Sequence, residues 1–347
     1  MVVRLASGSR FASGPTGLDE SLQRELDGLV TSAATSGVPW LDAELGRLLR
    51  RPGKRIRPGL VLASARCGPI LDLSTALTCA AAIELLHRST LVHDDLMDGA
   101  KFRGGEPTLH HTSGVAGALL GGDYLFGVGG RLIVQVGQEA AAVWHEAYLD
   151  LCDGQARETA NRYLTITDEE YLRVIRGKTG SLIRAACELG ALCSGLPVAG
   201  VRALARFGDC FGIVFQLVDD LLDVVSTPAL CGKPVRHDAA QGVYTPPLLL
   251  AARRDGVALG PDLPPERIAA LYRTALEHGV TPTVAAAYDW ADRARVALSA
   301  LPASPAREGL AELPEQHVTE ALATRVAPEH RHLVATLIRR GEPVALA

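Results

Sequence analysis

Apolar residues recur along most of the chain at the three- and four-residue spacing of an α-helix, and no stretch alternates as a strand would. The clearest segment is Thr75–Leu96, in which Ala, Leu and Ile dominate and neither Gly nor Pro interrupts the pattern. Similar patterns predict helices at Tyr124–Gln135, Glu139–Tyr163, Asp168–Leu192 and Val198–Val225. The sequence therefore predicts helices joined by short breaks.

Local signals predict where several helices begin and end. A helix is expected to begin near Asp19, and Thr167, which three acids follow, is expected to cap another. Gly and Pro residues predict loops at Gly99–Pro107 and Ser226–Asp238. Gly177–Gly180 is expected to break the helix in which it lies.

Composition indicates which ligands and which cellular compartment the protein suits. The formal net charge of −4 gives no general attraction to nucleic acid or to an anionic membrane, so a bound anion needs a local cluster of cations. The seven cysteines are odd in number and form no C-x-x-C pair, as is typical of reduced core cysteine. The most apolar region, Val115–Val136, contains Asp123 and Arg131, which argues against a membrane span. We expect a soluble, cytoplasmic protein with a mobile, Gly/Ser/Pro-rich leader over residues 1–18.

Two clusters of carboxylates share one spacing. Asp94, Asp95 and Asp98 are i,i+3 and i,i+4 neighbours, so a helix would gather them on one face. The same spacing returns downstream in Asp219, Asp220 and Asp223. Both clusters lie in apolar stretches, where unpaired acids would cost on the order of several kcal/mol each. Two such helices facing each other would form a cage for a cation.

Mg²⁺ is the cation that such clusters suit. It takes oxygen ligands and completes its shell with water and substrate phosphates, whereas zinc would favour His or Cys. A solvated acidic helix face would explain one cluster alone, but the repetition of the spacing argues against it.

Basic and polar groups near these clusters suggest an anion. Arg50–Pro58 brings five basic residues to a Pro-Gly turn before an apolar run, which suits a phosphate clamp or a solvated helix start. His87 lies two turns before Asp94 on the same helix face, where a ligand role and a core role are both open. Lys178 and Thr179, side by side at the predicted break, suit an anion or a surface kink.

These features resemble the motifs of the trans-isoprenyl diphosphate synthases, also called the polyprenyl synthetase family. The two acid clusters resemble the two aspartate-rich motifs of that family. The other matches follow in family order from about Arg51 to Leu250: Gly53–Pro58 (G-K-R-x-R-P), His87, Gly154-Gln155, Lys178-Thr179, Phe215-Gln216, and Gly232-Lys233 with Asp238.

The resemblance implies an all-α isoprenoid synthase fold, an antiparallel helical bundle around a central cavity, with residues 19–347 as a single prenyltransferase domain in a homodimer. Such enzymes join an allylic diphosphate to isopentenyl diphosphate and release pyrophosphate. The implied catalytic residues are the six aspartates, which would bind Mg²⁺, and Lys178. The residues implied to hold the allylic diphosphate are Arg103, Lys178, Thr179, Gln216 and Lys233. Those implied to hold isopentenyl diphosphate are Lys54, Arg57 and His87.

Two positions depart from the family pattern. Gly104 stands where the family has the second of two paired arginines, which the resemblance implies would grip isopentenyl diphosphate, and Val243 stands where the family has a further basic residue. Losing one charge-assisted phosphate contact costs about 1.5 to 3 kcal/mol, roughly 10- to 150-fold in affinity. One outcome is that Arg88, Lys101 or Arg236 supplies the positive charge that these two positions lack.

The other outcome is a changed function. A class I terpene cyclase or an altered-acceptor prenyltransferase would use only the allylic diphosphate, and a weakly active partner subunit of a heteromeric synthase is a further alternative. Aromatic residues, which stabilise carbocations, make up only 5% of the chain, and this argues against cyclisation. The predicted function is chain elongation to about geranylgeranyl length or longer.

Product length provides a first test. In the family, a bulky residue five places before the first aspartate shortens the product. Here the small Ser89 occupies that position, which predicts a deep cavity. A deeper aromatic residue such as Phe126 would also close the cavity. We expect Ser89→Phe to yield shorter products, as measured by chromatography of the dephosphorylated prenyl alcohols. Unchanged product length would contradict this placement of the pocket floor.

Overall fold

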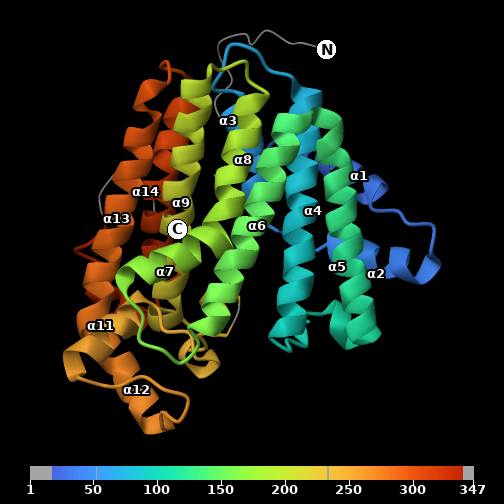
Figure 1. Ribbon diagram of the computed structural model, residues 1–347. Helices are drawn as coiled ribbons and strands as arrows, with labels where there is room; N and C mark the ends of the chain where they lie inside the picture. Colours follow the sequence, from blue (N-terminus) through green and yellow to red (C-terminus); the bar gives the residue numbers. More distant parts are fainter. Residues whose placement is uncertain (1–17, 52, 233, 339–347) are drawn as a thin grey trace. The chain divides into compact units, whose positions relative to one another are not determined.

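The computed structural model describes residues 18–338 except Pro52 and Lys233, and helices make up most of this part of the chain (Figure 1). The elements of the first part are α1 (Glu20–Ala33), α2 (Pro39–Leu49), α3 (Ile56–Ala65), α4 (Leu73–Met97), β1 (Phe102–Arg103), β2 (Glu106–Pro107), α5 (Leu109–Val136) and α6 (Gln138–Ala160). Those of the middle are α7 (Asp168–Ile175), the π-helical turn η1 (Arg176–Gly180), α8 (Ser181–Leu192), α9 (Val198–Val225), α10 (Pro228–Cys231) and the 3₁₀ turn η2 (Ala239–Gln241). The remainder are α11 (Pro246–Asp255), α12 (Pro265–Thr274), η3 (Ala275–Gly279), α13 (Val280–Ala297), η4 (Leu298–Ala300), α14 (Pro305–Thr324), η5 (Pro328–His330) and α15 (Arg331–Val334).

Contacts between residues divide the chain into two compact units. Unit 1 comprises the described residues up to Leu151 together with Ser181–Asp209 and Val296–Ala311. Unit 2 comprises Cys152–Gly180, Cys210–Arg295 and the described residues from Glu312 onward. The single domain expected over residues 19–347 remains a prediction, and the expected leader lies, apart from Leu18, outside the described residues.

Unit 1 is organised around α4. This helix packs against α1, α3, α5 and α8, and Figure 1 shows α4 and α5 lying side by side. Its apolar residues from Cys79 to Leu86 are inaccessible to solvent, because neighbouring helices cover them on several sides. From α6, Trp144 Nε1 donates a hydrogen bond to the Ala82 carbonyl at 3.2 Å. Polar residues farther along α4 are therefore held in apolar surroundings.

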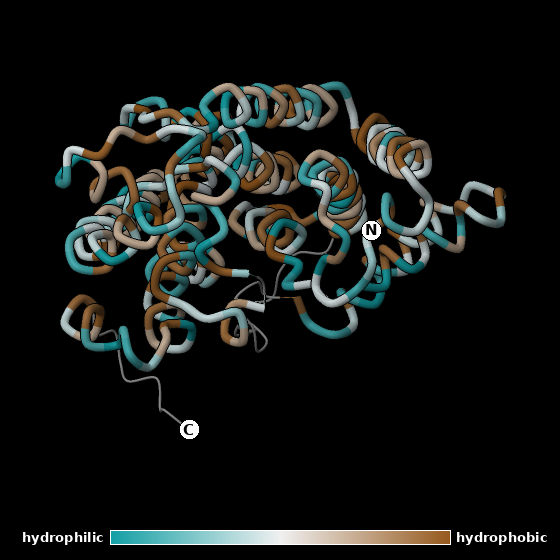
Figure 2. The backbone as a smooth tube through the Cα atoms, turned by 90° about the horizontal axis from the view of Figure 1, so that it is seen from below, coloured by the Kyte–Doolittle hydropathy of each residue, from teal (hydrophilic) through white to brown (hydrophobic). Residues whose placement is uncertain are grey.

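Unit 2 contains α11, α12 and η3, which contact one another. Gly279 lies so near α11 that an added Cβ would be 2.5 Å from the Pro247 carbonyl oxygen. The ring of Phe215 stacks on that of His317, with centroids 5.0 Å apart. In Figure 2 short apolar and polar stretches alternate along the helical coils, as expected when each helix has an apolar face.

The helix starts expected from the sequence are confirmed. The Asp19 side chain accepts a hydrogen bond from the Leu22 amide at 2.8 Å, and the Thr167 hydroxyl accepts one from the Glu170 amide at 3.2 Å. The segment Thr75–Leu96 lies within α4. Within the described ranges, no helix is both long enough and apolar enough to cross a membrane.

Other local predictions were wrong in detail. Helix α5 begins at Leu109, well before Tyr124, with a kink at Gly114 (φ +70°), and packing against α4 keeps the Gly-rich segment after the kink helical. Gly177–Gly180 does not break the helix but forms the π-helical turn η1, with Gly212 of α9 packed against Gly180. The loop Gly99–Pro107 contains the β1–β2 hairpin, and the loop after Ser226 contains the single turn α10.

The cysteines fit the expectation in part. All seven are free thiols. The buried ones are Cys67, Cys79, Cys187 and Cys193, whereas Cys210 and Cys231 are half-buried and Cys152 is exposed.

The contact between α3 and α8 gives a stability test. A Cβ on Gly190 would lie 2.1 Å from the Val61 carbonyl oxygen, so we expect Gly190→Ala to lower the free energy of unfolding by about 1 to 3 kcal/mol. Gly28→Ala in α1 is the matched control, because its Cβ would meet no atom within 4 Å. That change should stabilise the protein by about 0.5 to 1 kcal/mol. Equal effects in denaturant titrations would refute the close helix approach.

Candidate active site

The first aspartate motif lies at the C-terminal end of α4. Asp95 is buried, Asp94 is half-buried and Asp98 is exposed. Asp95 Oδ1 accepts a hydrogen bond from Arg103 Nε at 2.6 Å. Burial raises the pKa of the Asp95 carboxyl, and the positive charges of Arg103 and Arg51 oppose that rise. The carboxylate thus lies beside cations that favour its ionised form.

Arg103 is carried by a tight hairpin. β1 and β2 pair antiparallel, and the two residues that join them, Gly104 and Gly105, have φ values of +59° and +83°. Hairpin turns with positive φ at both central residues favour Gly, because other L-residues are strained there. The backbone of the turn therefore accounts for Gly at position 104.

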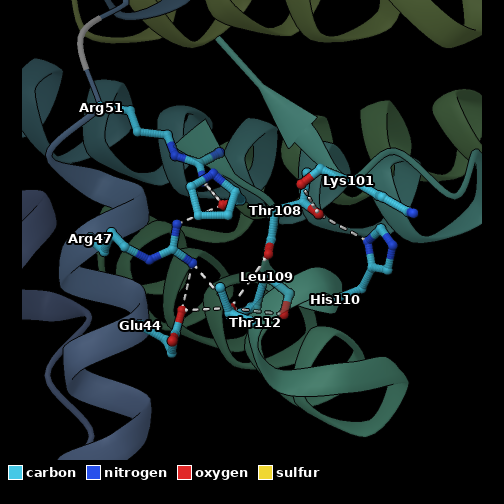
Figure 3. A network of polar contacts seen from close by, with 9 residues as sticks. Glu44, Arg47, Arg51, Lys101, Thr108, Leu109, His110 and Thr112 are labelled. Carbon is cyan, nitrogen blue, oxygen red and sulfur yellow. Dashed lines mark hydrogen bonds and ion pairs between the residues drawn. The ribbon is translucent and has the colours of Figure 1, made fainter. Parts of the chain in front are cut away.

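Two arginines hold the hairpin in place (Figure 3). Arg47 Nη1 donates a hydrogen bond to the Pro107 carbonyl oxygen at 2.6 Å, and Arg51 Nη2 donates to the same oxygen. Arg47 also bonds Glu44 at 2.6 Å. The Thr108 hydroxyl donates to the carbonyl of Ala100 at 2.7 Å. These bonds fix the segment that presents Arg103.

A second group of cations surrounds His87. Glu84, buried on α4, accepts hydrogen bonds from Arg88 Nε at 2.7 Å and from Arg55 Nη1. Arg57 Nη1 lies 3.2 Å from His87 Nε2. Burial, followed by the charges of Arg57 and Arg88, holds the pKa of His87 well below its usual value. The ring is therefore neutral, and its Nε2 accepts a hydrogen bond from Arg57.

The second aspartate motif ends α9, in unit 2. Asp220 is buried and Asp219 is half-buried. The Tyr171 hydroxyl donates to Asp220 Oδ2, and Gln216 Nε2 donates to Oδ1 at 2.7 Å. Burial and the nearby Asp220 charge raise the pKa of Tyr171 well above its usual value, so the phenol stays protonated as a donor.

Asp223 is held in a similar way. It is buried, and the Tyr272 hydroxyl donates to its Oδ2 at 2.8 Å while the His237 amide donates to Oδ1 at 3.0 Å. Burial and the charge of Asp223 raise the pKa of Tyr272. Two tyrosines, from α7 and α12, therefore orient two carboxylates of the second motif.

The turn η1 presents Lys178 and Thr179. Lys178 Nζ pairs with Glu158 at 2.6 Å, and the Thr179 hydroxyl donates to Gln216 Oε1 at 2.7 Å. A π-helical turn displaces side chains from the α-helical register, as is common at functional sites. Gly154 of α6 lies beside the backbone of η1, where a Cβ would be 2.2 Å from the Lys178 amide nitrogen. This close approach explains the Gly of the Gly154-Gln155 pair.

The structure brings together only some of the residues expected to form the site. In unit 1, Arg103 contacts Asp95, and Arg57 contacts His87. In unit 2, Thr179, Gln216 and Asp220 form one hydrogen-bonded chain. Lys54 is exposed in the loop before α3, and Lys233 lies outside the described residues.

Sequence reasoning missed the groups that position the site. These are Glu84, Tyr171, Tyr272 and Glu158. Glu84 carries a signal in the sequence, because it is a charged residue within the apolar segment Thr75–Leu96. The two tyrosines gave no signal, because each lies 49 residues from the aspartate that it contacts.

The acidic clusters fit a hard divalent cation. In the part of the chain that the structure describes, no three acidic, His or Cys side chains lie close enough to hold a metal ion among themselves. The donor set nevertheless suits Mg²⁺, since each motif offers carboxylate oxygens and Mg²⁺ completes its shell with water and substrate phosphates. Hydrogen bonds to Asp95, Asp220 and Asp223 orient these groups, as outer-shell donors do in metal sites.

Two oriented aspartate motifs on separate helices, with cations nearby, define a class of helical enzymes that act on diphosphates. The model of the polyprenyl synthetase family matches residues 38–258 of this chain. The chain therefore belongs to the polyprenyl synthetase family, adopts the all-α isoprenoid synthase fold and is a prenyltransferase.

Individual relatives of this chain are also prenyl synthases. The chain is 36% identical over 288 residues to a nonaprenyl diphosphate synthase of Mycobacterium tuberculosis, covering 78% of this chain and 84% of the relative. It is 36% identical over 275 residues to a heptaprenyl diphosphate synthase component 2 of Geobacillus stearothermophilus, covering 77% and 85%. A solved polyprenyl synthase from Caulobacter crescentus CB15, complexed with calcium and isoprenyl diphosphate, matches with a TM-score of 0.81 at 32% identity, covering 89% of this chain and 96% of the other.

The tyrosine that contacts Asp223 gives a further prediction. Tyr272→Phe removes a hydrogen bond to a buried carboxylate, so we expect the free energy of unfolding to fall by about 1.5 to 3 kcal/mol. Tyr244→Phe is the matched control, because its hydroxyl makes only a 3.4 Å bond to the neutral Gly260 carbonyl. If urea titrations gave equal losses of unfolding free energy for both variants, the hydrogen bond from Tyr272 to Asp223 would contribute no more to stability than the weak bond of Tyr244.

Proposed function

We propose that this prenyltransferase condenses an allylic diphosphate with isopentenyl diphosphate and releases pyrophosphate. The supporting observation is the group of cations around His87, in which Arg57 donates to a neutral imidazole rather than to an acid. This group lies two turns of α4 before the first aspartate motif and suits a second diphosphate. An enzyme that ionises a single diphosphate has no need of a second cationic site.

The aspartates at positions 94, 95, 98, 219, 220 and 223 are proposed to hold Mg²⁺ together with the allylic diphosphate. The calcium in the solved relative is consistent with this, because both ions prefer oxygen ligands. Bound Mg²⁺ would neutralise the charge that develops on the diphosphate as the C–O bond breaks.

The allylic diphosphate is proposed to contact cations that pair with acids in the described structure. Arg103 pairs with Asp95, and Lys178 pairs with Glu158. Substrate phosphate would replace these carboxylates as the partner of each cation, and Thr179, Gln216 and Lys233 would add donors. Lys54, Arg57 and His87 are proposed to hold isopentenyl diphosphate, and an apolar pocket would shield the allylic cation from water.

The product is proposed to be of about geranylgeranyl length or longer. Ser89 is fully buried in α4, so only a small side chain occupies the expected pocket floor. Phe126 packs against Tyr148 and Trp144, with ring centroids 4.5 and 5.0 Å apart. The relatives are named for products that range from farnesyl to nonaprenyl, so the proposed length depends on Ser89 and is not drawn from them.

One observation favours a second candidate. Gly104 and the half-buried Val243 lack the cations that the family pattern has at these places. A cyclase or altered-acceptor enzyme would use the allylic diphosphate alone. A weakly active partner subunit is the third candidate, since one relative is named as component 2 of a heptaprenyl diphosphate synthase.

A homodimer in the cytoplasm is also part of the proposal. Val115, Leu119, Leu120 and Val134 expose 47 to 62% of their surface on α5, an apolar surface of the kind that marks protein interfaces. The seven free cysteines suit a reducing compartment.

Product analysis decides among these functions. We expect elongated prenyl diphosphates when the protein is incubated with Mg²⁺, isopentenyl diphosphate, and geranyl, farnesyl or geranylgeranyl diphosphate. Chelation of the metal should abolish turnover. A hydrocarbon or alcohol formed without isopentenyl diphosphate would instead identify the second candidate. Activity that appears only with another synthase subunit would identify the third.

A further inference from the structure

The cation lost at position 104 needs a replacement if isopentenyl diphosphate is bound tightly. The three residues that the sequence offered are poorly suited to this role. Arg88 is buried and pairs with Glu84 at 2.7 Å, so its charge is already compensated. Arg236 lies over the Tyr272 ring in unit 2, 5.8 Å from the ring centroid. Lys101 is exposed beside the hairpin, and its ammonium group has no planar fork that could bind two phosphate oxygens.

Arg51 has properties that these residues lack. Its Nη2 donates to the Pro107 carbonyl, three residues after Gly104, so its guanidinium lies against the hairpin that carries position 104 (Figure 3). Its Nε is buried and has no hydrogen-bond partner among the described residues. A buried donor without a partner destabilises the protein, unless a ligand satisfies it.

Arg57 shows the same feature. Its Nε is also buried without a partner in the described structure, although its Nη1 contacts His87. The positive charge of Arg88 acts on both Arg51 and Arg57. Two guanidinium groups, each with a buried Nε that has no partner in the described structure, therefore lie near a third arginine, and this arrangement suits an anionic ligand.

The neighbouring Arg47 differs in one respect. It donates to the same Pro107 carbonyl oxygen, but its other terminal nitrogen contacts Glu44 at 2.6 Å and Thr112 at 3.2 Å. Arg47 thus anchors the hairpin, whereas Arg51 anchors it and retains an unused donor. A comparison of substitutions at Arg47 and Arg51 therefore distinguishes an effect on the hairpin from an effect on ligand binding.

We propose that Arg51 binds the diphosphate of isopentenyl diphosphate, in place of the arginine that Gly104 replaces. The Nε and one terminal nitrogen of its planar guanidinium form a fork that matches two phosphate oxygens. This inference rests on the proposed function, because it assumes that isopentenyl diphosphate is a substrate.

The main test is steady-state kinetics of Arg51→Gln and Arg51→Lys. We expect Arg51→Gln to raise the KM for isopentenyl diphosphate roughly 10- to 150-fold. The KM for the allylic diphosphate and kcat at saturation should change little. Arg51→Lys should be intermediate, because it keeps the charge but not the fork. An unchanged KM for isopentenyl diphosphate in Arg51→Gln would overturn the proposal.

Arg47→Gln is the matched control, because it loses a hydrogen bond to the same carbonyl oxygen. We expect it to leave the KM for isopentenyl diphosphate nearly unchanged. If Arg47→Gln and Arg51→Gln raise this KM alike, the effect comes from a loosened hairpin and Arg51 is not a ligand.

A double substitution tests whether Arg51 replaces the missing side chain. In a Gly104→Arg background, Arg51→Gln should raise the KM for isopentenyl diphosphate much less than in the wild type. Gly104→Gln controls for backbone strain, since φ is +59° at this position. An equal rise in the Gly104→Arg and wild-type backgrounds would show that the two positions are unrelated.

Calorimetry of isopentenyl diphosphate binding distinguishes failure of the proposed function from failure of the proposed role of Arg51. Wild-type protein that neither binds this compound nor elongates an allylic substrate would refute the proposed function, and the inference with it. Wild-type protein that elongates, together with an Arg51→Gln variant that binds isopentenyl diphosphate equally well, would refute the inference alone.

Discussion

A charged side chain inside an apolar helical bundle needs a partner within that bundle, and in unit 1 the partner is Glu84. This glutamate, 3% exposed on α4, accepts hydrogen bonds from Arg55 and Arg88. Stranding one member of such a group costs about 3 to 5 kcal/mol, so the three residues stay together. The basic loop before α3 is thereby fastened to α4. Its residues then divide into Arg55, which secures the loop, and Arg57, which reaches His87.

The two aspartate motifs share a spacing but differ in how their acids are held. In unit 1 a cation, Arg103, bonds Asp95 and offsets its charge. In unit 2 neutral phenols of Tyr171 and Tyr272 bond Asp220 and Asp223. Neutral donors orient a carboxylate without cancelling its charge, which leaves that charge for a metal ion. Under the proposed function, the first motif would exchange its arginine partner when a diphosphate binds, whereas two carboxylates of the second motif are oriented beforehand.

In the β1–β2 hairpin, backbone conformation and phosphate binding favour different residues at position 104. Its turn requires positive φ at Gly104, which a glycine meets without strain. Phosphate binding would favour an arginine at the same place. In this chain the turn has the residue that suits its backbone, and Arg51 contacts the same hairpin through the Pro107 carbonyl.

The sequence by itself determined the helical character, the two acid clusters, the basic loop and the family, because all of these depend on short spacings along the chain. Local pattern also located the caps at Asp19 and Thr167. It failed at Gly177–Gly180, where a π-helical turn continues the helix, and at the start of α5, where packing against α4 keeps a Gly-rich segment helical after the kink at Gly114. Only the tertiary structure decided which donors hold which acids. Tyr171 and Tyr272 are each 49 residues from their aspartates, and Arg51 is 56 residues from the carbonyl that it contacts. No local pattern encodes such pairs, because they follow from how the helices pack.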